Sequence, residues 1–106
     1  MVNIKKFKFK SNKFIIGDVV YVKPGIILSE VSALHIIIPN TPAIITNIWH
    51  IGKHRNIMIY MFCKSMLTRS ILSRHFTAKD NELEKRTVPP NDSNTIDSLL
   101  DNLKNI

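Results

Sequence analysis

The chain is poor in cysteine, glycine and long apolar runs. Its single cysteine, Cys63, cannot form an internal disulfide, and its three glycines form no glycine-rich phosphate loop. No window approaches the roughly 18 consecutive apolar residues that span a membrane. The lysines of MVNIKKFKFK precede no apolar run of the kind that secretory signals contain. These absences predict a soluble protein of a reducing, cytoplasmic compartment, with no membrane partner.

Acidic residues are also scarce, but only in the first three quarters of the chain. Residues 1–79 contain twelve Lys or Arg against Asp18 and Glu30, a net charge of +10, whereas residues 80–106 carry a net charge of −3. A basic body attracts polyanions through phosphate attraction and counterion release. Seventeen Ile, eleven Lys and ten Asn are also what an AT-rich genome favours, so composition bias is the alternative explanation. With the small size, this composition favours a phage or a similar mobile element as the source.

Groups suited to metal binding or catalysis are few. The four histidines, at positions 35, 50, 54 and 75, have no spacing that suits a metal, and one cysteine makes no zinc motif. Asp18 and Glu30 are the only acids of the body, and Asp18 beside Gly17 is typical of a turn. We therefore expect no cofactor, no metal and no enzymatic activity.

A length of 106 residues is that of one compact domain. The alternation of lysine and phenylalanine in KKFKFKSNKF predicts a basic edge strand or arm over residues 1–12. Lysine on an exposed edge also discourages aggregation, which is an alternative to phosphate binding. FIIGDVVYVKPG predicts a strand that Pro24 and Gly25 close, with a bend or bulge at Gly17 and Asp18.

The middle of the chain predicts a β-hairpin. After a long connection with a short strand at His35 to Ile38, AIITNIWHI and NIMIYMFCK are two strands joined through Gly52 to Arg55. Both faces of the second strand are apolar, so the rest of the domain or a partner must cover both. Trp49 and Tyr60 flank the turn, where their rings can either stack on a base or fill the core.

The last third combines a helical spacing, a linker and a helix. Residues 65–76 space their apolar side chains more like a helix than a strand, which predicts a short helix or helical turn leading into a last strand. NELEKRTVPPNDSN predicts a linker over residues 81–92. After it, Ser93 or Thr95 can cap a helix over residues 93–106. Its apolar stripe contains the candidate partner-binding residues Ile96, Leu99, Leu100 and Leu103.

A helix of roughly a dozen residues is marginal alone, so this one must dock on the domain, on a second copy in a homo-oligomer, or on another protein. We expect a docking element that is not part of the main β domain.

The order of these elements resembles a known architecture. F-I-I-G-D-V-V-Y-V-K, a long loop, P-A-I-I-T-N, a basic hairpin and a further strand resemble the small SH3-like barrels, including KOW-type and Tudor-like domains of transcription and translation proteins. The resemblance covers about residues 13–80. It implies a mainly β fold: a small SH3-like barrel over residues 13–80 with a short helical turn and the C-terminal amphipathic helix.

A weaker resemblance is to the mRNA interferase toxins, which carry G-D-V-V-x-V, a long loop and R-P-A-x-I-x-x-N. Here Thr41 to Asn47 stand in the place of the second motif, but Thr41 stands where that family has its catalytic arginine, and Ser65 could occupy its later hydroxyl position. A hydroxyl cannot supply the fixed positive charge that stabilises a phosphorane. This resemblance therefore implies a degenerate, inactive relative.

Together these features predict a non-catalytic binding module that contacts DNA or RNA, or a nucleoprotein machine such as RNA polymerase or the ribosome. At the hairpin tip, Lys53 and Arg55 would donate to phosphates. The candidate nucleic-acid-binding residues are Lys6, Lys8, Lys10, Lys23, Trp49, Lys53, His54, Arg55, Tyr60, Lys64, Arg69 and Arg74. The alternative is a protein-interaction module, such as a host-takeover inhibitor or virion component, whose interface is the two-faced strand and the C-terminal helix.

Overall fold

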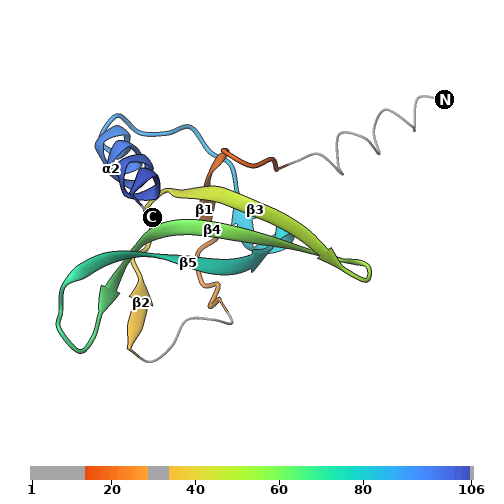
Figure 1. Cartoon of the computed structure of the whole chain (residues 1–106), viewed down its shortest axis with the longest axis horizontal. Coiled ribbons are helices and arrows are strands. Elements are labelled where there is room, and N and C mark those ends of the chain that lie inside the picture. Colours follow the sequence, from red (N-terminus) through yellow and green to blue (C-terminus); the bar gives the residue numbers. More distant parts are fainter. Residues whose placement is uncertain (1–13, 29–33, 106) are drawn as a thin grey trace.

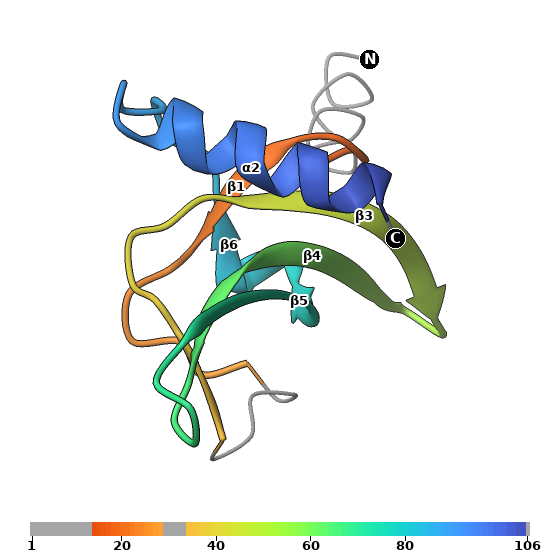
Figure 2. The ribbon, with the colours of Figure 1, turned by 60° about the vertical axis from the view of Figure 1, so that its left-hand side comes forward.

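A computed structural model describes residues 14–28 and 34–105, so the predicted basic arm, with Lys6, Lys8 and Lys10, lies outside the described residues. The described chain is mainly β, with an antiparallel sheet and one C-terminal helix (Figures 1 and 2). Its elements are β1 (Val19–Val22), β2 (His35–Ile37), β3 (Ala43–Ile51), β4 (His54–Ser65), β5 (Ile71–Lys79), the 3₁₀ turn η1 (Asp80–Glu82), β6 (Leu83–Glu84) and α2 (Asp92–Lys104).

The sheet is built around β4. The strand order is β2-β4-β3-β1-β6, and β5 pairs with the other edge of β4. Along one edge, β4 pairs first with β3 and then, near Ser65, with β2; along the other it pairs with the whole of β5. The predicted mainly β class with a C-terminal helix is therefore confirmed.

The β3–β4 hairpin forms where the sequence predicts it, with a tighter turn. Ile51 pairs with His54, so only Gly52 and Lys53 make the turn. Gly52 has φ +60°, as the first central residue of a type II′ turn requires. A bulge at Thr46 shifts the register, so Ile45 and Ile48 both reach the core.

The two faces of β4 are both covered by this chain. Its inner face, defined by the fully buried side chains of Ile57, Ile59, Met61 and Cys63, packs with Phe14, Leu28, Phe76 and Leu83. Its outer face carries Tyr60, which is buried with Ile44 beneath α2. The expectation that both faces of this strand are covered is confirmed, and the cover on both sides comes from the chain itself.

Residues 65–76 form no helix, although they do lead into the predicted last strand. Met66 to Thr68 form a turn, and from Ile71 onward the chain is the extended strand β5, paired with β4 through nine residues. The burial of Phe76 and Ala78 against the core and the long ladder outweigh the helical spacing of the apolar residues. The short 3₁₀ turn lies later, at Asp80–Glu82.

The segment predicted as a linker begins inside the sheet. Leu83 is fully buried in the core and pairs with Val22, so β6 extends the sheet beyond β1. Helix α2 starts at Asp92, with Asn91 at the N-cap, so Ser93 and Thr95 lie within the helix and the predicted caps are wrong.

Helix α2 docks on the outer face of the sheet (Figure 2). Leu99 is fully buried there, Ile96 and Leu103 are partly buried beside it, and Leu100 is 43% exposed. Two hydrogen bonds fix the helix: the Tyr21 hydroxyl donates to Asp92 Oδ2 at 2.7 Å, and Asn102 Nδ2 donates to Ser73 Oγ at 3.2 Å. Of the predicted partner-binding residues, only Leu100 is exposed in this arrangement.

No helix within residues 14–28 and 34–105 has the length and apolar character that crossing a membrane requires.

Candidate nucleic-acid interface

The tip of the β3–β4 hairpin and the chain that follows β5 enclose an open depression of about 420 Å³. Its lining residues are Lys53, His54, Arg55, Lys79, Asp80 and Asn81. Three of them, at positions 53–55, are predicted site residues. The other three were missed, because only the pairing of β4 with β5 brings Lys79 opposite Asn56 and so beside the hairpin tip.

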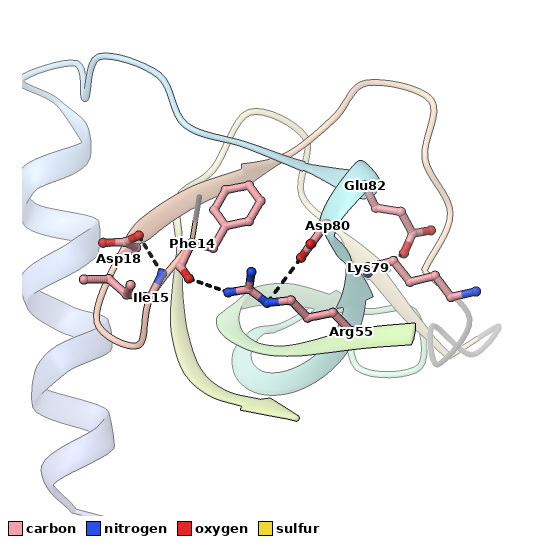
Figure 3. Close-up of polar contacts among 7 residues, drawn as sticks. All are labelled: Phe14, Ile15, Asp18, Arg55, Lys79, Asp80 and Glu82. Atoms are coloured by element: carbon pink, nitrogen blue, oxygen red, sulfur yellow. Dashed lines mark hydrogen bonds and ion pairs between the residues drawn. The ribbon is translucent and has the colours of Figure 1, made fainter. Parts of the chain in front are cut away.

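Arg55 has a structural role in this depression. Its side chain is only 15% exposed; Nη2 donates to the carbonyl oxygen of Phe14, and Nε lies 3.7 Å from Asp80 Oδ1 (Figure 3). Because Arg55 has the same parity along β4 as Ile57, it faces inward. Arg55 therefore ties the backbone at Phe14 to η1, and its predicted contact with phosphate stays a prediction.

The exposed donors of the depression are Lys53, His54 and Lys79. Lys79 extends away from Arg55, while its backbone N–H donates to Glu82 Oε1 at 2.9 Å (Figure 3). Neither Lys53 nor Lys79 has an ion-pair partner within the described part of the chain. Asp80, the carboxylate among the lining residues, is paired with Arg55.

The remaining acids of the sheet region are also engaged. Lys85 Nζ lies 2.9 Å from Asp18 Oδ2, and Arg86 Nη2 lies 3.1 Å from Glu84 Oε2. Glu82, whose Oε1 accepts from the Lys79 N–H, has no ion pair among the described residues, but the exposed Lys53 and Lys79 outnumber it at the hairpin tip, which favours an anionic ligand.

The two aromatic candidates differ in their surroundings. Tyr60 is only 4% exposed; its hydroxyl shares a 2.6 Å hydrogen bond with Ser73 Oγ, and the His75 ring lies 4.7 Å from its own, centroid to centroid. It is not available to stack on a base, and that prediction is wrong. Trp49 is only partly buried and pairs with Asn56 on the outer face.

The other basic candidates lie away from the tip. Lys64, Arg69 and Arg74 are exposed at the opposite end of the β4–β5 pair. Arg74 Nη1 lies 3.0 Å from a ring nitrogen of His35, and Arg69 has φ +58° in the tight turn before β5. The structure does not bring these three residues together with Lys53.

A second pocket, of about 240 Å³, corresponds to the region of the toxin resemblance. Lys23 and Thr41 line it, over a floor that includes Ile37 and Met61. The Thr41 hydroxyl donates to the carbonyl of Ile38 at 2.7 Å, so it closes a local turn. Ser65 is not among the lining residues; its Oγ accepts a 3.3 Å hydrogen bond from the Thr68 N–H.

Comparison with known proteins finds no matching family model, no matching curated protein and no matching solved structure. Among residues 14–28 and 34–105, no three His, Cys, Asp or Glu side chains gather in a group that could hold a metal ion.

Proposed function

We propose that this protein is a non-catalytic nucleic-acid-binding module that contacts phosphates through the tip of the β3–β4 hairpin. The observation that carries the proposal is the depression lined by Lys53, His54 and Lys79, in which the only carboxylate, Asp80, is paired with Arg55. Phosphate contacts of this kind supply affinity and little sequence preference. The body's net charge of +10 supports the same partner.

We also propose that the sheet is an SH3-like barrel. Three features support this: β1 pairs with both β3 and β6, strands β3 to β5 follow one another as a meander, and a single 3₁₀ turn separates β5 from β6. In such a barrel the hairpin tip projects from a rigid scaffold, as binding loops commonly do.

A non-catalytic role is supported by the two hydroxyls of the toxin resemblance. Thr41 and Ser65 do not line one pocket, and each is held in a local turn. Among residues 14–28 and 34–105, neither hydroxyl is hydrogen-bonded to a Lys or Arg side chain, whereas the transition state of enzymatic phosphoryl transfer needs positive charge nearby. Purified protein is expected to leave a long unstructured RNA intact.

The direct test measures binding of a fluorescently labelled oligonucleotide by anisotropy at 50 to 200 mM salt. If six or more phosphates are neutralised, affinity falls by orders of magnitude over this range. The double variant Lys53→Gln, Lys79→Gln should weaken binding and reduce the slope of log K against log salt by about 2, one for each lost contact.

Lys104→Gln is the matched control, since Lys104 is an exposed lysine at the end of α2. Absence of binding to DNA and to RNA at 50 mM salt would refute the proposal. An equal loss from the Lys104 variant would refute the assignment to the hairpin tip.

A second candidate function, protein interaction, is favoured by an apolar row at the opposite end of the sheet. Ile36, Lys64 and Ile71 are paired across three strands, and the two isoleucines are 45% and 64% exposed. A partner segment with an acidic side chain between two apolar ones fits this row, because Lys64 lies between the two isoleucines. Such binding would weaken little with salt, unlike phosphate binding.

A further inference from the structure

Within the described part of the chain, helix α2 covers only part of the outer face of the β3–β4 hairpin. Helix α2 lies over the end of the sheet near Tyr60, and the distal half of the hairpin extends beyond it (Figure 1). On this distal half, Trp49 pairs with Asn56 of β4, and Asn56 pairs with Lys79 of β5. The three side chains form one row across three strands, on the face opposite Ile57.

The chemistry of this row differs from that of a plain phosphate site. An indole stacks on a nucleobase, the Asn56 amide offers both a donor and an acceptor to a base edge, and Lys79 also lines the basic depression. Strands lie about 4.8 Å apart, so the row spans about 10 Å from Trp49 to Lys79. A nucleotide stacked on Trp49 can therefore place a phosphate within reach of the long Lys79 side chain.

We infer that this row, Trp49–Asn56–Lys79, is a base-stacking subsite for single-stranded nucleic acid. The inference rests on the proposed function, because it adds a base to the phosphates bound at the tip. A base within a duplex is already stacked on both sides, so the Trp49 ring can stack only on an unpaired base or on the base at a strand end. The site therefore prefers single strands to duplexes.

Trp49 is the only tryptophan of the chain, which makes its fluorescence a specific reporter. Three ligands of equal length are titrated at one salt concentration: a single-stranded pyrimidine oligonucleotide, an abasic strand and a blunt duplex. The single strand should quench the emission of Trp49 and bind about 5- to 100-fold more tightly than the abasic strand. The abasic strand should bind without quenching.

Variants at Trp49 separate stacking from phosphate binding. Trp49→Ala should lower affinity for the single strand to that of the abasic strand and leave affinity for the abasic strand within about twofold, since phosphate contacts persist. Trp49→Phe retains a smaller ring, so its affinity for the single strand should lie between those of the wild type and Trp49→Ala. This variant replaces Trp49→Ala in the test if the alanine variant does not fold.

Equal affinities for single strand and duplex, or binding of the single strand without quenching, would overturn the inference and leave phosphate binding intact. Absence of binding by all three ligands would instead overturn the proposed function.

Discussion

Tyr60 and Trp49 lie on the outer face of neighbouring strands, yet they occupy different environments. Tyr60 sits beneath Leu99 of α2 and is 4% exposed, whereas Trp49 lies on the distal half of the hairpin, beyond the helix. The two rings have similar apolar character, so the difference comes from what covers them. An aromatic residue on this sheet becomes core where the helix docks and a candidate ligand contact where it does not.

Charged side chains also differ between the end of the outer face that the helix covers and the end that it leaves open. The covered end carries the acidic helix, with Asp92 accepting a hydrogen bond from Tyr21 and with Asp97 and Asp101 exposed. The open end carries exposed Lys53 and Lys79. One end of the outer face is therefore packed beneath the helix, and the other is the end at which we propose that an anionic ligand binds.

The largest effect is expected from weakening the docking of α2 on the sheet. Leu99→Ala removes a fully buried side chain between Ile44 and Tyr60 and should lower the free energy of unfolding by about 2–5 kcal/mol. Urea denaturation gives the value. Leu100→Ala, at a side chain 43% exposed, should change it by less than about 0.5 kcal/mol and is the control. Similar losses from both variants would mean that the helix packs differently.

A second experiment separates structure from binding within the basic tip. Arg55→Met leaves Asp80 and the Phe14 carbonyl without their partner and should destabilise the fold by about 1–3 kcal/mol. Lys53→Met, at an exposed position of the same turn, should alter stability by less than about 0.5 kcal/mol and weaken nucleic-acid binding. If Arg55→Met leaves the urea midpoint unchanged, the structural role of Arg55 is wrong.

The smallest expected effect concerns the hydrogen bond at the start of α2. Tyr21→Phe removes the donor to Asp92 and should cost about 0.5–1.5 kcal/mol at neutral pH. Burial, together with the hydrogen bond to Asp92 and its charge, raises the pKa of Tyr21 to about 12.

Because the folded protein holds this phenol proton more tightly than the unfolded chain, the stabilisation is complete below about pH 10. It is lost as the pH rises from about 10 toward 12. The difference in unfolding free energy between wild type and Tyr21→Phe, measured from pH 8 to 11.5, should therefore shrink with pH. A difference that stays constant would contradict the raised pKa.

Sequence patterns predicted the strands and the helix that depend on residues close together in the sequence. The β-branched run from Ala43 to Ile51 and the two-faced apolar run of β4 indicate strands by composition alone, and α2 shows a regular apolar spacing. Where long-range pairing competes with spacing, prediction failed: Ile71 to Phe76 are extended because β4 offers them a free edge. Leu83, a single apolar residue among charges, gives no periodic signal, although it is fully buried.

The mainly β class, the hairpin with its basic turn, the amphipathic C-terminal helix and the uneven distribution of charge follow from residues that are neighbours in the sequence. Which basic groups remain exposed depends instead on the packing of distant segments. This packing paired Arg55 with Asp80, placed Lys79 beside the hairpin tip, covered Tyr60 and left Trp49 beyond the helix. These outcomes depend on which strands pair and where α2 docks, and contacts between residues distant in sequence fix both.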